Sequence, residues 1–252
     1  MKKWICCMLM VVSWNLIAQE DALFKNATTD YNEGRYEEAA AKYEEILEGG
    51  KHSAALYYNL GNTYYKLNRI APSIYYYEKA LLLDPGDPEI RNNLAFAKNM
   101  TLDDIAEVPQ TGLSRLLERT TGLMTFDQWA YLAVVFIFLF VFLYIAYYYL
   151  RYATQKRLAF ITSLVFLFLS LFALVFAYIQ FNNFKAEQPA IIFAPEVAVK
   201  SEPNDRSEAA FVLHEGTKVQ VLEQLNEWKR IQLADGSTGW IPQDALRVLK
   251  DF

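Results

Sequence analysis

The chain has 252 residues, a formal net charge of −5, and 24 Lys and Arg against 29 Asp and Glu. No basic face or Lys/Arg cluster appears outside one short loop, which argues against a nucleic-acid-binding protein. The two cysteines, Cys6 and Cys7, are adjacent in an N-terminal apolar run and cannot form a disulfide framework. Once the apolar segments are set aside, the length suffices for two small soluble modules rather than one large catalytic core.

The N-terminus has the pattern of an export signal. Two lysines precede an apolar run over residues 4–17 that is too short to span a bilayer and ends at Ala18. We therefore predict a secretory signal peptide over 1–18, cleaved after Ala18. An uncleaved anchor is the alternative. A lipoprotein is disfavoured because both cysteines precede most of the apolar core, too early for lipidation after cleavage.

Residues 20–100 carry a helical pattern that repeats with an offset of 34 residues. The offset aligns Gly34-Arg-Tyr36 with Asn68-Arg-Ile70, and Ala39 with Ser73. This period, with Leu60-Gly61 in the second copy and Pro85 at its end, resembles the tetratricopeptide repeat family. The resemblance implies a solenoid of antiparallel helix pairs, closed by a partial third helix over 89–96 that caps the stack.

The resemblance also implies a concave groove that binds an extended peptide or a terminal carboxylate, with Asn and Lys donors between aromatic walls. In the other interpretation, Asn62 and Lys66 are consensus residues with no specific ligand. The groove positions of the family fall on Phe24, Thr28, Tyr31, Tyr58, Asn62, Tyr65 and Lys66.

Residues 101–128 form a connector with a break at Pro109. Beyond the break, leucines such as Leu113, Leu116 and Leu117 recur at helical spacing around charged residues. We predict a short amphipathic helix at the outer membrane–water boundary. An ordinary helix packed on the repeats fits the pattern equally well.

Two apolar runs, over 129–150 and 158–181, contain no Asp, Glu, Lys or Arg and are each long enough to cross a hydrocarbon core of ~30 Å. The loop between them, 151–157, carries Arg151, Lys156 and Arg157. Short basic loops stay in the cytoplasm, so we predict a transmembrane hairpin whose two flanking regions lie on the outer side of the membrane.

The second span carries small residues within a narrow arc of its helical wheel, and its other faces are Leu, Phe and Val. Small residues let helix backbones approach closely in lipid, so the arc is a predicted contact surface. It receives either the first span of the same hairpin or the helix of a partner. The residues are Ala159, Ser163, Ser170, Ala173 and Ala177.

A polar linker is predicted over 182–195, followed by a β-rich module over 196–252 with turn signals such as Asp235-Gly236. The run from Phe211 to Leu222 and the pair Gly239-Trp240 resemble bacterial SH3 domains, which implies a small all-β barrel. In that family the glycine before the tryptophan lets two strands cross tightly. The aromatic doublet that binds polyproline in eukaryotic SH3 domains is absent.

Catalytic signatures are missing. The two histidines, His52 and His214, fall in different modules, and no cluster has metal-ligand spacing. There is no nucleophile elbow or P-loop, and both cysteines leave with the signal peptide. We expect no cofactor and no metal, and a non-enzymatic protein; a hydrolase, the third class considered, lacks a constellation to carry it.

The predicted fold class is therefore a multidomain membrane protein: an α-helical tetratricopeptide solenoid, a two-helix transmembrane hairpin and an SH3-like barrel. This order of modules resembles the BatE-type proteins of the aerotolerance (Bat) operon in Bacteroides-like bacteria. The resemblance implies partners with von Willebrand factor A domains, a MoxR-type ATPase, and a scaffold role in the inner membrane with both soluble modules in the periplasm. The alternative is a cell-wall sensor that binds peptidoglycan through the SH3-like module.

Overall fold

The structure is a computed structural model that describes residues 22–106, 112, 116 and 120–250. The predicted signal peptide and most of the predicted amphipathic helix around Leu113 and Leu117 lie outside these residues. The chain divides into two compact units. The first, which we call the repeat–sheet unit, holds the helices up to residue 98 and the strands from residue 189 onward; the second is a hairpin of two long apolar helices.

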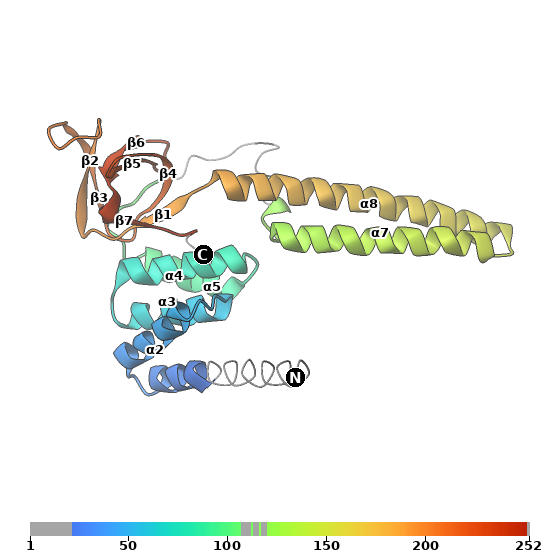
Figure 1. Cartoon of the computed structure of the whole chain (residues 1–252), viewed down its shortest axis with the longest axis horizontal. Helices are drawn as coiled ribbons and strands as arrows, with labels where there is room; N and C mark the ends of the chain where they lie inside the picture. The colour runs from blue at the N-terminus through green and yellow to red at the C-terminus, as the bar shows by residue number, and fades with distance from the viewer. Residues whose placement is uncertain (1–21, 107–111, 113–115, 117–119, 251–252) are drawn as a thin grey trace, which may run out of the picture. The chain divides into compact units, whose positions relative to one another are not determined.

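The repeat–sheet unit begins with helices that stack one after another (Figure 1). Residues 22–32 are helical and pair with α2, α3 pairs with α4, and α5 follows as the third helix of its kind. Local chemistry fixes the starts: the Ser53 hydroxyl caps α3 by accepting from Leu56 N–H, and Asp87 caps α5 ahead of Pro88. The bounds are α2 Tyr36–Glu48, α3 Ala54–Lys66, α4 Ile70–Leu83 and α5 Pro88–Lys98.

Close helix approach within the stack depends on small residues at the predicted positions. Gly61 on α3 lies against the Tyr77 ring on α4, and a Cβ built on Gly61 would stand 2.6 Å from Tyr77 Cδ1. Ala27, Ala39 and Ser73 are likewise fully buried. The stack therefore has the helix-pair geometry of a tetratricopeptide solenoid.

Seven strands form one antiparallel sheet in the order β3-β2-β6-β5-β4-β1-β7. The sequence predicts a closed barrel, but the pairings of the described strands give an open sheet with β3 and β7 at its edges. Closure would require β7 to pair with β3; β7 has only three residues, and it pairs with β1 instead. The bounds are β1 Pro189–Ile192, β2 Glu196–Lys200, β3 Ala209–His214, β4 Lys218–Leu225, β5 Trp228–Gln232, β6 Thr238–Pro242 and β7 Leu246–Val248, with a 3₁₀ turn at Gln243–Ala245.

The glycine that the SH3 resemblance singles out lies at a tight strand crossing. Gly239 on β6 faces β2, and a Cβ there would stand 2.3 Å from Val199 Cγ1 and 3.0 Å from the Lys200 carbonyl. Trp240, which follows it, is partly buried and pairs with Lys200. A side chain larger than hydrogen at residue 239 would force β2 and β6 apart.

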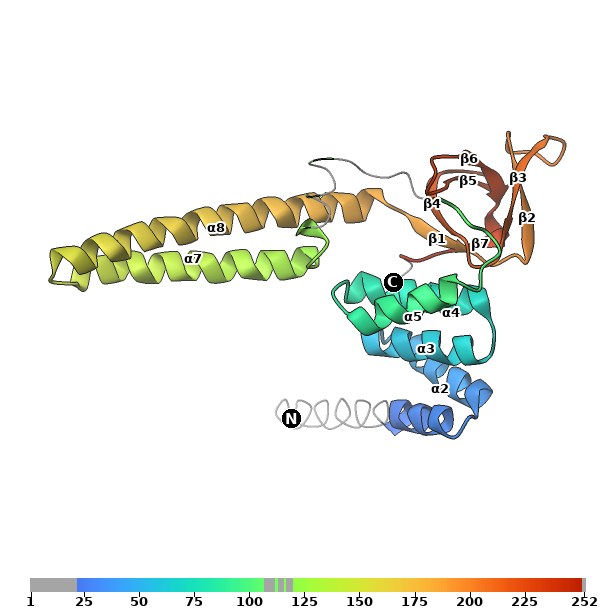
Figure 2. The same ribbon diagram turned by 180° about the vertical axis from the view of Figure 1, so that it is seen from behind.

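The region predicted as a linker over 182–195 is mostly regular structure. Residues up to Ala186 continue a long helix, and Pro189–Ile192 form β1 between β4 and β7. All four residues of β1 are buried, in contrast to the polar linker predicted from the sequence. Ala190 and Ile192 belong to the hydrophobic core of the sheet, and Ile191 belongs to the core of α4 and α5. Figures 1 and 2 show β1 and β7 as the strands beside α4.

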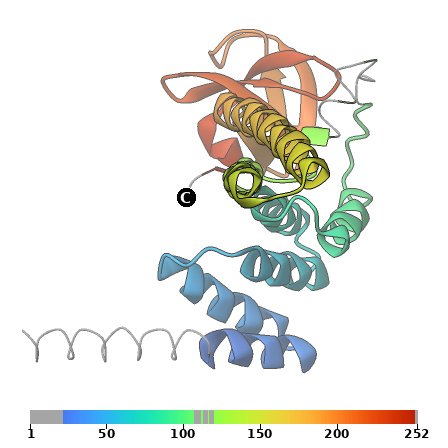
Figure 3. The ribbon, with the colours of Figure 1, turned by 90° about the vertical axis from the view of Figure 1, so that its right-hand side faces the viewer.

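The second unit consists of α7 (Phe126–Tyr149) and α8 (Ala153–Ala186), which lie side by side, as the end-on view in Figure 3 shows. A capping box between Thr125 and Gln128 starts α7. Among the described residues these two helices are long and apolar enough to cross a membrane, which is consistent with a two-span membrane protein. The loop is shorter than the predicted 151–157, because α8 already begins at Ala153 and includes Lys156 and Arg157.

Candidate functional site

A cavity of about 200 Å³ opens on one face of the helical stack. Its walls come from three alternate helices of the stack, the one over 22–32, α3 and α5, with one residue from α4. We call it the repeat groove. It is lined by Tyr31, Asn62, Tyr65, Lys66, Tyr77, Asn93 and Phe96.

The 34-residue period explains why these residues meet. Tyr31 and Tyr65 are separated by one period, as are Asn62 and Phe96, so each pair occupies the same face of equivalent helices in successive repeats. Four of the seven groove residues predicted from the sequence line the cavity: Tyr31, Asn62, Tyr65 and Lys66. The structure therefore gathers side chains from both repeats and from the third helix.

A hydrogen-bond network holds the floor of the repeat groove. The Tyr77 hydroxyl donates to Asn62 Oδ1 at 2.6 Å, and the Asn93 amide donates to the same oxygen at 2.9 Å. Asn93 also donates to the Tyr58 hydroxyl at 3.0 Å. Because Asn62 Oδ1 accepts twice, the orientation of the Asn62 amide is fixed and its N–H donors point away from that network.

The electrostatics of the groove favour a ligand with hydrogen-bond acceptors. Burial raises the pKa of the Tyr77 phenol, as it does for Tyr31, so both phenols are protonated at pH 7; the Tyr77 proton is already donated to Asn62, which leaves the Tyr31 hydroxyl as a donor for a ligand. Lys66 supplies a positive charge at the exposed rim. Phe96, with 61% of its surface exposed, provides an apolar wall that water covers in the unliganded protein.

The other three predicted groove residues have packing contacts. Phe24 packs edge-on against Tyr43 with ring centroids 5.5 Å apart, and Thr28 shares a 3.0 Å hydrogen bond with the Tyr43 hydroxyl. Tyr58 accepts from Asn93 behind the cavity. These side chains support the first repeat and the groove floor and do not line the cavity.

Sequence reasoning missed three groove residues, Tyr77, Asn93 and Phe96. A signal for Phe96 was present, since adding one period of 34 to Asn62 gives its position. The sequence predicts the third helix, α5, as a cap, whereas in the structure it also continues the groove face. Tyr77 comes from the second helix of its repeat, where period counting predicts packing rather than lining.

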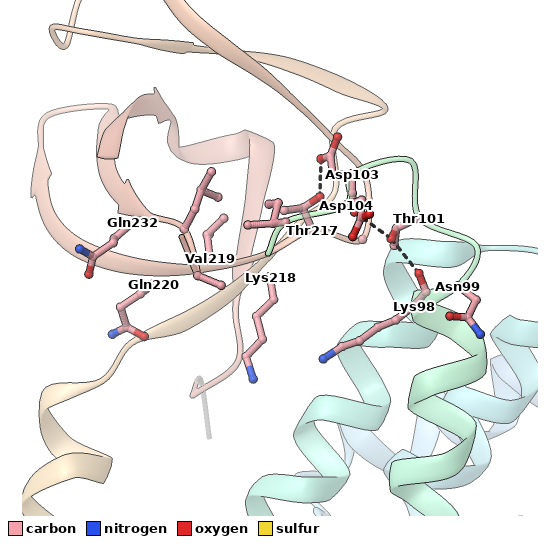
Figure 4. A pocket seen from close by; sticks show the side chains of 14 residues that line it. Lys98, Asn99, Thr101, Asp103, Asp104, Thr217, Lys218, Val219, Gln220 and Gln232 are labelled. Atoms are coloured by element: carbon pink, nitrogen blue, oxygen red, sulfur yellow. Dashed lines mark hydrogen bonds between the residues drawn. The ribbon is translucent and has the colours of Figure 1, made fainter. Parts of the chain in front are cut away.

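A second and larger cavity, of about 530 Å³, lies within the repeat–sheet unit where the end of α5 and the segment after it meet the sheet (Figure 4). We call this contact region the seam. Lys98, Thr101 and Asp103 line it from the helical side, and Thr217 and Lys218 line it from the sheet.

Asp103 is the main hydrogen-bond acceptor of the seam. Its carboxylate accepts from the His214 backbone N–H at 2.7 Å and from the Thr217 hydroxyl at 2.5 Å, and it contacts the His214 ring nitrogen Nδ1 at 2.7 Å. Partial burial alone would raise the pKa of Asp103, but these hydrogen bonds outweigh burial and hold the pKa below its ordinary value. His214 thus holds the β3–β4 turn against the helical side of the seam.

Glu78 on α4 forms the second polar contact of the seam. Its side chain is 7% exposed and receives Lys98 Nζ at 3.1 Å and Lys218 Nζ at 2.6 Å. Burial alone would raise the pKa of Glu78, but the two lysine charges outweigh burial and hold that pKa below its ordinary value, so the carboxylate is ionised. One lysine comes from the helices and the other from the sheet, so the carboxylate joins both.

In the hairpin unit, the predicted small-residue stripe faces the neighbouring helix. Ala159, Ser163, Ser170 and Ala173 are buried and Ala177 is partly buried, while the Leu, Phe and Val around them are mostly exposed. The Ser170 hydroxyl donates to the Ala133 carbonyl of α7 at 2.9 Å. The structure thus places the stripe against the first helix of the same hairpin.

Within the part of the chain that the structure describes, no three His, Cys, Asp or Glu side chains gather closely enough to hold a metal ion. Both cavities are lined by hydrogen-bond donors and lysine side chains, and the repeat groove also has aromatic walls, so both suit recognition of a polar ligand.

The fold and the groove define a class of protein that combines a helical-repeat module with a small β module and a hairpin of two long apolar helices. Comparison with known families supports both modules. The family model for the tetratricopeptide repeat matches residues 54–87, and the family model for the bacterial SH3 domain matches residues 195–247. A search of curated proteins found no match.

Proposed function

We propose that this protein is a non-enzymatic, membrane-tethered adaptor whose repeat groove binds an extended segment of a partner protein. The observation that carries the proposal is the groove itself, in which three alternate helices of the stack bring fixed amide groups, aromatic walls and Lys66 to one cavity. Extended peptides are recognised through such donors and walls. The match to a repeat family that serves protein–protein interaction supports the same interpretation.

The seam supports a shared compartment for both flanks of the hairpin. Asp103 precedes the hairpin in the chain and His214 follows it, yet the two are hydrogen-bonded. A chain can form that contact only if both flanks lie on one side of the membrane, as a two-span hairpin allows. The basic residues Arg151, Lys156 and Arg157 at the tip favour a cytoplasmic tip and hence an outer location for the repeat–sheet unit.

We further propose that the protein resides in a bacterial inner membrane, with the repeat–sheet unit in the periplasm, and acts as a BatE-type scaffold in an envelope complex linked to aerotolerance. The module order supports this proposal. Membrane proteins with von Willebrand factor A domains are the partners that it implies.

Peptidoglycan binding through the SH3-like sheet is the second candidate function, favoured by the family match over 195–247. Retention of the detergent-solubilised full chain on purified sacculi distinguishes the two candidates. The adaptor proposal predicts no retention above a background that Arg230→Ala leaves unchanged. The wall-sensor proposal predicts retention that substitutions on the exposed face of the sheet, such as Arg230→Ala, abolish.

Photo-crosslinking in native membranes tests the adaptor proposal. A photoreactive phenylalanine analogue replaces Tyr65 in the groove or, as a matched control, Ala41 on the exposed face of α2. We expect a discrete adduct to one polypeptide from residue 65, none from residue 41, and loss of the adduct when Lys66→Glu is added. Equal adducts from both positions, or an adduct that ignores Lys66→Glu, would contradict a groove ligand.

A further inference from the structure

We infer that the C-terminal sheet is the intramolecular cap of the tetratricopeptide stack, so that the face formed by α4 and α5 is an interaction surface whose partner is the chain's own SH3-like half. A solenoid repeat contacts only its neighbours, and the last repeat needs a covering element for its outer apolar face. Here the cover arrives from beyond the membrane hairpin. The SH3-like module is therefore part of the repeat domain's structure rather than a freely tethered ligand-binding module.

The apolar contacts of the seam carry the first part of the argument. Ile191 on β1 and Leu249 after β7 are 0% and 1% exposed, and both belong to the hydrophobic core of α4 and α5 rather than to the core of the sheet. Phe193 packs edge-on against Tyr75 with ring centroids 5.5 Å apart. Two buried aliphatic side chains and an aromatic pair remove several hundred Å² of apolar surface from water, which favours docking.

The polar contacts lock the same surface in one register. Asp103 accepts hydrogen bonds from the β3–β4 region, and Glu78 takes Lys218 of β4. A buried carboxylate is costly unless its partners are in place, so undocking the sheet would leave Glu78 with half of its cations. The contacts that bury charge are thus satisfied only in the docked arrangement.

The tip of the β3–β4 turn fits the helical surface without spare room. Gly216 has φ +88°, and a Cβ built on it would stand 2.9 Å from Thr101 Cγ2, 3.0 Å from Ile70 Cγ2 and 3.0 Å from Ile74 Cδ1. Gly236, in another turn of the same sheet, has the same φ of +88° but nothing within 4 Å. The two glycines therefore carry the same backbone strain on substitution and differ only in what a methyl group would meet.

This pair gives a matched test by hydrogen–deuterium exchange on the full chain in detergent micelles. Gly216→Ala and Gly236→Ala impose equal strain on the sheet, but only the first pushes a methyl group into α4. We expect amides of Ile70–Leu83 to exchange about tenfold faster in Gly216→Ala than in Gly236→Ala. Equal exchange of α4 in the two variants, whether fast or slow, would overturn the inference.

A reciprocal pair keeps the test decisive if Gly216→Ala disrupts its own turn. Asp103→Asn replaces one of the two acceptor oxygens of the seam carboxylate with an N–H donor and removes its charge, whereas Asp104→Asn changes its exposed neighbour. Both substitutions lie on the helical side, and the measured amides are those of β3 and β4 on the other side. Faster exchange of the β3 and β4 amides in Asp103→Asn alone would support docking of the sheet on the helices. Unchanged exchange of these amides in both variants would mean that the helices do not stabilise the sheet, which would overturn the inference.

Discussion

Lys218 of strand β4 donates to Glu78 of helix α4 at 2.6 Å, although 140 positions and the whole apolar helical hairpin separate the two residues. The Glu78 side chain is almost fully buried and the Lys218 side chain is 43% exposed. An ion pair with one buried partner is stabilising mainly because its loss strands a charge. The contact therefore holds two distant segments of the chain in one unit.

Removing that lysine should destabilise the unit strongly. Lys218→Met leaves Glu78 with Lys98 alone, so we expect a loss of about 3 kcal/mol in the free energy of unfolding. The control is Arg230→Met, which breaks an exposed pair with Glu223 and should cost less than about 1 kcal/mol. Urea unfolding of the full chain in micelles, followed by the near-ultraviolet tyrosine signal, measures both. Similar costs for the two substitutions would mean that the seam pair behaves as a surface pair.

Stability should fall in acid because of the same carboxylates. The pKa values of Asp103 and Glu78 are lowered in the folded protein, so the unfolded chain binds more protons as the pH drops. The stabilisation is complete above the ordinary values of 3.8 and 4.5 and is lost as the pH falls through the lower folded values. Urea midpoints between pH 6 and pH 3 should decline in the wild type and decline less in Asp103→Asn. An identical decline of the urea midpoint with pH in Asp103→Asn would show that Asp103 does not contribute to the acid sensitivity.

Gly61→Ala sets two effects against each other. Alanine is the better helix former by about 1 kcal/mol, which alone would stabilise α3. The added methyl group, however, would meet the Tyr77 ring at 2.6 Å, and overpacking of this kind costs about 1–3 kcal/mol. We expect net destabilisation and a weaker groove crosslink, because Tyr77 also holds Asn62. A variant more stable than the wild type would show that the ring yields freely.

The hairpin should depend on its small residues. Ser170→Phe places a large ring where α8 meets Ala133 of α7, whereas Leu171→Phe adds a similar ring to a position already 51% exposed. Close backbone approach is what stabilises such helix pairs in lipid. We expect Ser170→Phe alone to slow migration of the protein on a mild detergent gel, as an opened hairpin does. Equal mobility of the two variants would argue that the stripe is not the contact face.

The modules could be predicted from the sequence because each rests on a local or periodic signal. The spacing of Gly61 and Pro85 predicts the repeats, and the uncharged runs on either side of Arg151 predict the hairpin helices. The seam carries no such signal. Asp103 and His214 are 111 positions apart and each resembles an ordinary polar surface residue. Ile191 follows a proline in a segment of linker-like composition, and only tertiary contact shows that it belongs to a helical core.

The open edge of the sheet was also beyond prediction. The alternation of apolar residues indicates strands, but it does not say that β7 pairs with β1. The repeat groove could be predicted in part. The groove residues on the helix over 22–32 and on α3 follow from the repeat pattern, whereas Asn93 and Phe96 lie on the predicted cap helix, which keeps the groove face.

Side-specific labelling of single cysteines tests the central claim, that the helices and the sheet share one compartment, most directly. With Cys6 and Cys7 replaced by alanine, a membrane-impermeant maleimide is applied to Ala41→Cys on α2, Asp235→Cys in an exposed turn of the sheet, and Arg151→Cys at the hairpin tip. Residues 41 and 235 should label from the outer face of the membrane and residue 151 only from the cytoplasmic face. Labelling of residues 41 and 235 from opposite faces would contradict the account.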